Sequence, residues 1–222
     1  MKLLKESKRS LSGKRMEIEG KYHENVFINC PFDNKYEPIF KAIVFSIQIN
    51  GFYPKCAKEE ISDKYRLDRI LKLISECKYG IHDISRVEPD REKLPRFNMP
   101  FELGIFIGSR AFGNRSHQSK KYLVFDSKKF RCDKFFSDIK GIDPQTHNNN
   151  PYEALKITNL WLTQFRPPEK RTSYTGGETL IKNYKNFEKQ LPKICKEKGV
   201  NKEKLEFKGL CQAIGRWIEI NR

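Results

Sequence analysis

The chain is 222 residues long and strongly basic, since 44 Lys and Arg residues against 28 Asp and Glu residues give a formal net charge of +16. A hydrophobic fraction of 37% and an aromatic fraction of 12% are typical of a folded protein and exclude a wholly disordered one. No apolar run approaches the roughly 18 residues of a membrane span. The basic start of the chain lacks the apolar centre of a secretory signal, so we expect a cytoplasmic protein without a membrane partner.

The positive charge has two interpretations. It would attract nucleic acid, nucleotides or other anionic partners. Alternatively, it reflects a Lys-rich solvated surface, because Lys clearly outnumbers Arg and the charges are spread along the sequence. The second interpretation is favoured, with a phosphate-bearing ligand kept as a candidate.

The cysteines predict neither a disulfide framework nor a metal site. They occur singly, without a C-x-x-C pair or a cluster with histidine, which is the pattern of buried thiols in a reducing compartment. We therefore predict no metal and no bound cofactor. The six positions are Cys30, Cys56, Cys77, Cys132, Cys195 and Cys211.

Beyond a basic tail at 1–22, the hydrophobic pattern predicts alternating strands and helices. A short apolar run at 25–30 is typical of a buried parallel strand, and the following helical pattern stops at Asn50-Gly51, a helix-ending pair. After residue 150 the pattern is helical. In chain order we expect strands at 25–30, 52–57, 79–84 and 122–125 with a weak fifth at 138–143, and helices at 39–49, 67–74, 98–111, 152–161, 180–191 and 210–218.

This alternation predicts an α/β protein. We expect a flavodoxin-like or Rossmann-like open parallel sheet of four to five strands, with helices on both faces and a C-terminal helical extension. The corresponding division is a flexible basic tail at 1–22, a nucleoside- or nucleotide-binding domain at 23–148 and a helical extension at 149–222 that packs on it. In such sheets a ligand binds outside the carboxyl ends of the strands, where the strand order reverses. Three segments are expected to converge there, namely 30–34, 83–86 and 98–102.

One carboxylate stands out in this pattern. Glu102 falls in the first turns of a helix that is apolar nearly all round, and helices of that kind are buried. No Lys or Arg lies at helical spacing to pair with it, and a charge on an apolar face needs a partner or a purpose. The alternative is that Glu102 merely complements the helix dipole, although with Asn98 as N-cap it lies one position beyond a capping box.

Asp83 is the predicted partner of Glu102. It ends the strand at 79–84, so both acids can point into one crevice. Breaking an N-glycosidic bond calls for a carboxylate that attacks or stabilises an oxocarbenium-like sugar carbon, and for a second group that manages protons. We expect the helix N-terminus to keep Glu102 ionised and nucleophilic. The alternative for Asp83 is a loop cap.

The residues after the first strand are expected to form one wall of this crevice. Aromatic rings there would stack on a base or a ribose, with plain core packing as the alternative. A nucleophilic role for Cys30 is disfavoured, since no histidine is near in sequence. His82 is expected to be buried on the opposite strand face, and His147 carries no functional signal. The wall comprises Phe27, Asn29, Cys30, Pro31 and Phe32.

These residues resemble the nucleoside 2-deoxyribosyltransferase-like superfamily, relatives in fold of the TIR domains that cleave NAD. The similarity rests on the run at 26–32, on Asp83 at a strand end, and on the Phe-Glu-Leu-Gly helix start at 101–104. The resemblance implies that Glu102 is the nucleophile and that Asp83 orients the sugar. It also implies that Phe27 stands where a phenol usually orients the nucleophile.

The resemblance covers the first four predicted strands and has one departure. The family usually carries Asp-Ser-Gly just before the helix, whereas this chain has Arg96, Phe97 and Asn98. Arg96 and Asn98 are therefore expected to contact a phosphate or a ribose. Arg86 and Met99 complete the set of candidate substrate-binding residues.

The leading hypothesis is an enzyme that cleaves or exchanges the N-glycosidic bond of a nucleoside, nucleotide or NAD-like substrate, with Glu102 attacking C1′. Relatives in fold often act as effectors in bacterial antiviral systems, which suggests a nucleotide-depleting role by analogy. The resemblance further implies a homo-oligomer, because active sites of that family are often completed by a neighbouring subunit. Two alternatives are a non-catalytic nucleotide-sensing module and a basic nucleic-acid-binding protein.

Overall fold

The computed structural model describes residues 22–58, 65–86, 97–131, 142–166, 176–197, 199 and 205–221. Residues 1–21 of the predicted basic tail, the candidate residue Arg96, Cys132 and most of the predicted fifth strand lie outside these ranges. Tyr22, predicted to end the flexible tail, is instead buried, and its hydroxyl donates to the Ser116 carbonyl. No disulfide joins the described cysteines, and four of these are buried. In the described part of the chain, no helix is both long and apolar enough to cross a membrane.

The centre of the protein is an open sheet of five strands, all parallel, in the order β2-β1-β3-β4-β5. The predicted α/β class with an open parallel sheet is therefore confirmed. An apolar run from Val26 to Ile28 accounts for β1, and both β1 and β3 are buried along their whole length. The strands are β1 (Asn25–Asn29), β2 (Tyr53–Cys56), β3 (Tyr79–Asp83), β4 (Lys121–Asp126) and β5 (Gln145–Thr146).

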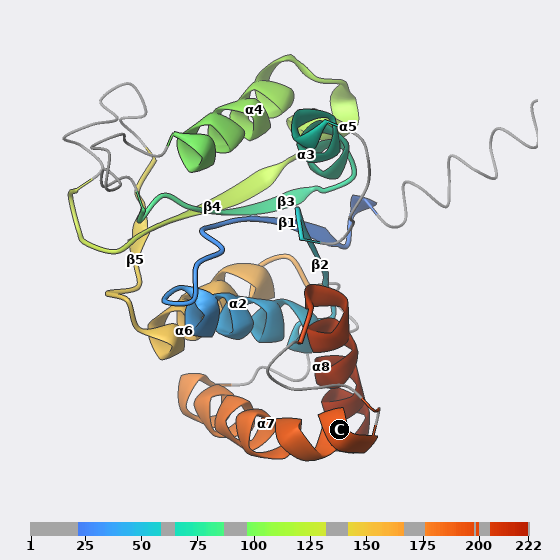
Figure 1. Ribbon diagram of the computed structural model, residues 1–222. Helices are drawn as coiled ribbons and strands as arrows, with labels where there is room; N and C mark the ends of the chain where they lie inside the picture. The colour runs from blue at the N-terminus through green and yellow to red at the C-terminus, as the bar shows by residue number, and fades with distance from the viewer. Residues whose placement is uncertain are drawn as a thin grey trace, which may run out of the picture.

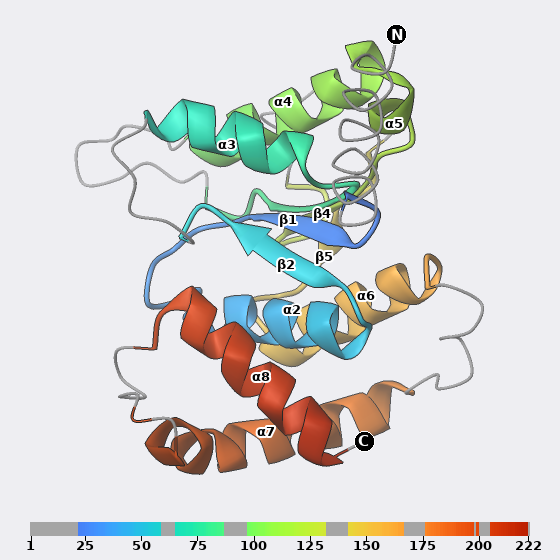
Figure 2. The same cartoon turned by 90° about the vertical axis from the view of Figure 1, so that its right-hand side faces the viewer.

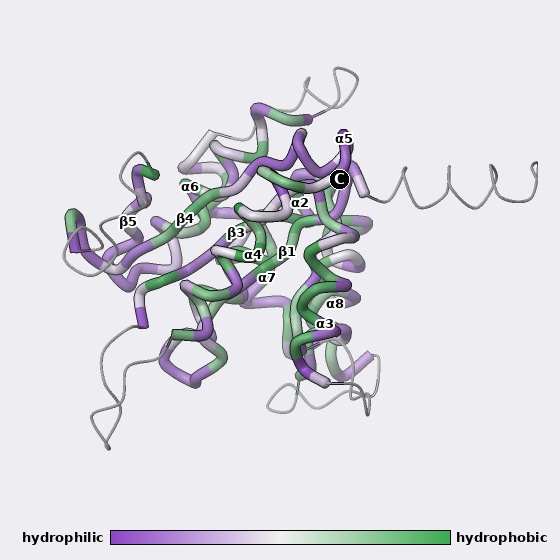
Figure 3. The backbone as a smooth tube through the Cα atoms, turned by 90° about the horizontal axis from the view of Figure 1, so that it is seen from above, coloured by the Kyte–Doolittle hydropathy of each residue, from purple (hydrophilic) through white to green (hydrophobic). Residues whose placement is uncertain are grey.

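Helices cover both faces of the sheet (Figure 1). One face carries α3, α4 and α5, and the other carries α2 and α6, with α7 and α8 forming a further layer outside α2 and α6 (Figure 2). Along α3 and α8, hydrophobic and hydrophilic stretches alternate as expected for amphipathic helices (Figure 3). The helices are α2 (Glu37–Ile49), α3 (Arg66–Ser75), α4 (Asn98–Phe112), α5 (Arg115–Gln118), α6 (Pro151–Thr163), α7 (Gly177–Glu197) and α8 (Phe207–Asn221).

The helix that is buried on nearly all sides is α2. Its Phe45 side chain is fully buried and packs against Tyr184 and Phe187 of α7 and Trp217 of α8, at ring-centroid distances of 5.2, 5.3 and 5.4 Å. Its other faces contact the sheet and α6 within the same buried cluster. The C-terminal helices therefore share one core with α2 and the strands.

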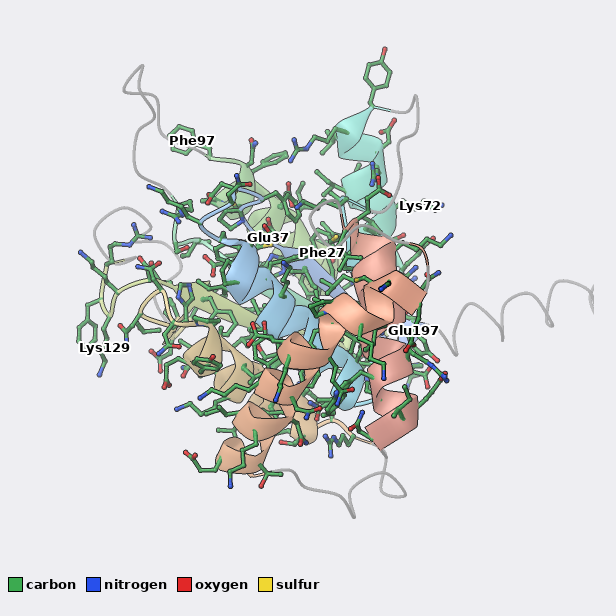
Figure 4. All side chains as sticks on the ribbon, turned by 60° about the horizontal axis from the view of Figure 1, so that its bottom comes forward. Phe27, Glu37, Lys72, Phe97, Lys129 and Glu197 are labelled. Atoms are coloured by element: carbon green, nitrogen blue, oxygen red, sulfur yellow. The ribbon has the colours of Figure 1, made fainter. Side chains whose placement is uncertain are left out.

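The prediction that α4 is buried all round is wrong. Its inner face is buried through Met99, Leu103 and Phe106, but Phe101 is 56% exposed and Phe112 is 92% exposed. The physical reason is that α4 belongs to the outermost layer, where no other described element covers its outer face (Figures 1 and 2). The Phe97 ring at its start likewise projects from the surface, whereas Phe27 lies in the interior (Figure 4).

Three smaller expectations also differ from the structure. Asn98 is the first residue of α4 and Phe97 is the N-cap, and no described side chain caps this helix. The helix predicted at 67–74 begins one residue earlier and ends one residue later as α3, and its Leu67 and Leu71 are substantially exposed. The fifth strand is the two-residue β5, held by pairing with the end of β4, which is too short to produce a hydrophobic signal in the sequence.

Candidate active site

The predicted ligand-binding edge lies between β1 and β3, which are neighbours in the sheet. The helix after β1 covers one face and the helices after β2 and β3 cover the other (Figure 1), so the strand order reverses at this point. The three segments expected to converge do so. Arg86 lies 3.6 Å from Asp33 in an ion pair, and Asn29 donates to the Met99 carbonyl of α4 at 2.9 Å.

Asp83 ends β3 and is fully buried in a hydrogen-bond network. Its Oδ2 atom accepts from the Tyr36 hydroxyl at 2.6 Å and contacts Nε2 of His147 at 2.9 Å, while Oδ1 accepts from the backbone N–H of Ser85 at 2.8 Å. Burial raises the pKa of Tyr36 well above its usual value, and the Asp83 charge raises it further. Tyr36 is therefore a neutral donor, and both oxygens of Asp83 are occupied.

The hydrogen bonds of His147 determine its tautomer. The backbone N–H of Asn149 donates to Nδ1 of His147 at 2.9 Å, so Nδ1 carries no proton. Nε2 must then carry the ring proton and donate it to Asp83. The positive-φ residues Asn148 (φ 51°) and Asn149 (φ 56°) form the turn that brings this N–H back to the ring. Such a conformation is one that asparagine tolerates better than most residues.

Asn29 joins the two strands of this edge to α4. Its side-chain amide donates to Nδ1 of His82 at 3.1 Å and to the Met99 carbonyl at 2.9 Å. Burial lowers the pKa of His82 to about 3, with a further contribution from Lys120, so the ring is neutral. The prediction that His82 is buried against a helix is confirmed, since its ring lies 4.9 Å from that of Phe106.

A close approach at this contact requires a glycine at position 80. A Cβ atom on Gly80 would lie 2.6 Å from Nε2 of His82 and 2.9 Å from the Phe106 ring, distances too short for any side chain. Gly80 therefore allows α4 to pack closely on β3. That packing fixes the height of the first turns of α4, and of Glu102, above the sheet.

The surroundings of Glu102 differ from those of Asp83. Its side chain belongs to a residue that is only 6% exposed, yet it has no hydrogen bond or ion pair with any other residue that the structure describes. Burial raises its pKa from 4.5 to about 7, and the charge of Arg66 at the start of α3 partly opposes this rise. The expectation that the helix N-terminus keeps Glu102 fully ionised is wrong, because desolvation outweighs the dipole at this position.

Cys30 lies within electrostatic reach of both acids. Burial raises the pKa of its thiol well above the usual value, and the charges of Asp83 and Glu102 both add to the rise, while Lys58 opposes it. Cys30 is therefore a protonated thiol and not a nucleophile, as the sequence indicated. Its position places the two carboxylates around one end of β1.

The other predicted wall residues divide into two groups. Phe27 is fully buried in the cluster between the sheet and α3 and α4, away from the strand end. Pro31 is also buried, while Phe32 is half-buried against Phe40 at 5.8 Å, with the Lys58 ammonium 4.8 Å from its ring centroid. Of the two aromatic rings predicted to form this wall, Phe32 is the one that is partly exposed and lies next to a cation.

Asp126 supplies a third carboxylate at the same edge of the sheet. Its Oδ1 atom accepts from Nε and Nη2 of Arg131 at 2.9 and 2.6 Å, and Nη2 also donates to the Ile84 carbonyl at 3.0 Å. Arg131 thus ties the end of β4 to the end of β3. The other oxygen of Asp126 is buried without a described hydrogen-bond partner.

Sequence reasoning found Asp83, Glu102 and Asn29 but missed Tyr36 and His147. Both contact Asp83 from distant parts of the chain, and neither has a local pattern that would reveal it. Asn98 and Met99 lie at the start of α4, exposed and buried respectively. Within the described ranges, no group of three or more His, Cys, Asp or Glu side chains is arranged to hold a metal ion.

Comparison with known proteins gave no significant match, since no family model fits the chain and no curated protein or solved structure is similar to it.

Proposed function

We propose that this protein is an enzyme that cleaves or exchanges the N-glycosidic bond of a nucleotide or NAD-like substrate, with Glu102 as the nucleophile. The observation that supports this most is Glu102, a residue only 6% exposed whose carboxylate has no described partner, at the predicted ligand-binding edge of a parallel sheet. A buried charge of that kind costs free energy unless something compensates it. A substrate whose sugar carbon becomes positively charged in the transition state would compensate it.

The chemistry requires two half-reactions. In the first, an oxygen of Glu102 bonds to C1′ while the C1′–N bond breaks, and the bonding electrons leave with the base. Adenine takes up a proton from solvent as it leaves, whereas the nicotinamide of NAD, a cation in the substrate, leaves as the neutral base without one. In the second, water adds to C1′, its proton passes to solvent, and the C1′–O bond to Glu102 breaks to release the sugar and the carboxylate. A second base in place of water would give exchange.

Asp83 has a positioning role in this proposal. Three of the four acceptor positions of its carboxylate are already used by Tyr36, His147 and the backbone of Ser85, and the side chain is fully buried, which favours a structural role over proton transfer. It instead holds the loop after β3 and the start of α2 in fixed places beside β1. The proton-relay part of the sequence hypothesis is therefore not carried forward.

Three cations around the site favour a substrate with phosphate groups over a plain nucleoside. The Lys58 ammonium lies over the Phe32 ring, and its charge partly opposes the rise in the pKa of Cys30. Arg66 acts on Glu102 in the same direction, and Arg86 lies beside Asp33. Arginine and lysine side chains recognise phosphate oxygens, and a phosphate-bearing substrate also agrees with the net charge of +16.

The test is base release from a panel containing NAD, ATP, AMP and adenosine, followed by chromatography. We expect wild-type protein to release a free base from a phosphate-bearing member, and Glu102→Gln to lose at least about 10²-fold of the rate. Since the nucleophile must be ionised, the wild-type rate should rise with pH and reach half its plateau near the pKa of about 7. Glu178→Gln, an exposed glutamate at the start of α7, is the matched control and should retain full activity.

Two results would contradict the proposal in different ways. Release that is unchanged in Glu102→Gln would assign the chemistry to another residue. Binding of a panel member without any release would make the protein a nucleotide sensor, and titration calorimetry on the same samples distinguishes that case. Affinity for a DNA duplex that falls steeply with salt and is unaffected by Glu102→Gln would instead indicate a nucleic-acid-binding protein.

A further inference from the structure

The outward face of α4 is uncharged along its whole length, although the helix belongs to the outermost layer (Figures 1 and 2) and 32% of the residues of the chain are charged. Three phenylalanine side chains on this face are 56%, 68% and 92% exposed, and the residues between them are small. The positions recur at the spacing of one helix face. This outer stripe of α4 comprises Phe97, Phe101, Gly104, Gly108, Ala111 and Phe112.

Both charged residues of α4 lie away from the outer stripe. Glu102 is buried, and the Arg110 guanidinium lies 5.7 Å from the ring centroid of Tyr122 in β4. The neighbouring helix α3, in contrast, exposes the charged residues Asp68 and Lys72 to solvent. An exposed apolar stripe without charges is typical of an interaction surface, whereas a solvated helix face carries charges as α3 does.

The two glycines of the outer stripe have no packing role in the described fold. A Cβ atom added to Gly104 or Gly108 would lie in open space, with no atom of another described element within 4 Å. Glycine within a helix is less favourable than alanine, so both positions cost stability without a benefit inside the chain. Since glycine allows two backbones to approach closely, we infer that another helix packs against this stripe.

We propose that the outer stripe binds the same stripe of a second copy of this chain, with the two α4 helices antiparallel about a two-fold axis. When Gly104 of one copy lies opposite Gly108 of the other, Phe101 lies opposite Ala111. Each large ring then meets a small residue. A parallel pair would instead place like rings against each other at both ends and hold the helices apart. Antiparallel packing also aligns the two helix dipoles favourably.

The exposed area matches that of a weak but specific dimer. Together the three rings expose about as much surface as two whole phenylalanine side chains, which is roughly 400 Å² per copy. Two copies would therefore bury roughly 800 Å² from the rings alone. The backbone of the two glycines and the Ala111 methyl group would bring the total to about the 1,000 Å² expected of a biological interface.

The net charge of +16 opposes such a dimer only in part. The stripe itself carries no charge, and repulsion between more distant surface charges is screened beyond about 8 Å at physiological salt. Added salt should therefore strengthen this dimer, whereas it would weaken binding to an acidic partner. A membrane surface would account for the rings and the basic charge but not for the glycines, because lipid does not require close approach of the backbone.

The experiment is sedimentation equilibrium of the full-length protein from about 1 to 200 μM, at about 0.15 and 0.5 M NaCl. We expect a monomer–dimer equilibrium whose dissociation constant is lower at the higher salt concentration. Phe112→Asp should raise that constant at least tenfold. The matched control is Ile220→Asp, which changes an apolar residue that is 55% exposed on α8, beyond the other face of the sheet. It should dimerise as wild type does.

A second variant separates the dimer contact from the stability of the monomer. Because open space surrounds position 108 and leucine favours a helix more than glycine does, Gly108→Leu should unfold at the same or a higher temperature than wild type. Its dimer should nevertheless be lost, since the bulky side chain keeps the two helices apart.

Three results would overturn the proposal. One is a wild-type protein that stays monomeric over the whole concentration range, and another is a dimer that neither Phe112→Asp nor Gly108→Leu weakens. The third is a monomer that binds vesicles of phosphatidylserine and phosphatidylcholine and loses this binding on Phe112→Asp, because the stripe would then dock on a membrane.

Discussion

The two buried carboxylates of this protein have opposite surroundings. Asp83 receives three hydrogen bonds and lies on the α2 side of the sheet, whereas Glu102 of α4 has no described partner and a pKa raised to about 7. Both are nearly inaccessible to solvent. The difference teaches that burial alone does not mark a functional acid. What matters is whether the protein itself satisfies the charge, because a hydrogen-bonded carboxylate stabilises the fold, whereas burying one without a partner costs free energy.

The largest loss of stability is expected from removing the hydrogen-bonded carboxylate of Asp83. Asp83→Ala leaves the Tyr36 hydroxyl and His147 Nε2–H buried without an acceptor, so we expect a loss of about 4 kcal/mol in the free energy of unfolding. Urea denaturation measures it. Asp33→Ala, which removes a partly exposed carboxylate from the neighbouring loop, should cost well under half as much. Equal losses would remove the distinction between the network and the loop surface.

Removing the carboxylate of Glu102 should increase the free energy of unfolding, whereas removing that of Asp83 should decrease it. Because the folded pKa of Glu102 exceeds its unfolded value of 4.5, the folded state holds its proton more tightly. Wild-type stability therefore falls as pH rises from about 4.5 to about 7 and stays reduced above that range. Glu102→Gln should be more stable than wild type at pH 8, by on the order of 3 kcal/mol, and equally stable at pH 4.

Thermal unfolding of both proteins across this pH range tests the prediction. Glu178→Gln is again the control and should follow the wild-type curve. A Glu102→Gln variant that is less stable than wild type at pH 8 would mean that Glu102 has a stabilising partner, and the contrast with Asp83 would fail.

A smaller loss of stability is expected from a variant in which Asp83 keeps two of its three hydrogen-bond donors. Tyr36→Phe removes only the hydroxyl that donates to Oδ2, so we expect a loss of about 2 kcal/mol, typical of a hydrogen bond to a charged group. Chemical denaturation at pH 7 measures it. Tyr53→Phe, in which the tyrosine is exposed on β2, should change the stability by less than the error of the measurement.

The smallest loss of stability is expected at Asn29, which connects β1 and β3 to α4. Asn29→Ala removes the hydrogen bonds to His82 and to the Met99 carbonyl, for which we expect a loss of about 1.5 kcal/mol. Amide hydrogen exchange should show faster exchange in the first turns of α4 than in β3. A uniform increase across the protein would show that Asn29 does not specifically attach α4 to the sheet.

The alternation of strands and helices and the three segments of the ligand-binding edge could be predicted from the sequence because they depend on local patterns. An apolar run marked β1, and Asp83 at the end of β3 and Glu102 near the start of α4 could be read directly from the sequence. Tyr36 and His147 could not be found, since their hydrogen bonds to Asp83 span 47 and 64 residues. A sequence pattern of short range carries no information about such partners.

Burial of helices was harder to predict than their existence. The composition of α4 and that of α2 are both strongly apolar, yet only α2 is enclosed. The difference is made by α7 and α8, which cover α2 from the end of the chain and leave α4 in the outer layer (Figure 2). Hydrophobicity shows that a helix can be buried, but the arrangement of distant elements determines whether it is.

The enclosure of α2 has a consequence for synthesis. Phe45 leaves the ribosome long before Tyr184, Phe187 and Trp217, the rings that cover it. At 5–20 residues per second, the delay is roughly 10 to 30 s. For that time the growing chain presents an uncovered apolar helix, which is the kind of segment that chaperones bind. The enclosure of α2 is therefore completed only after α8 has been synthesised.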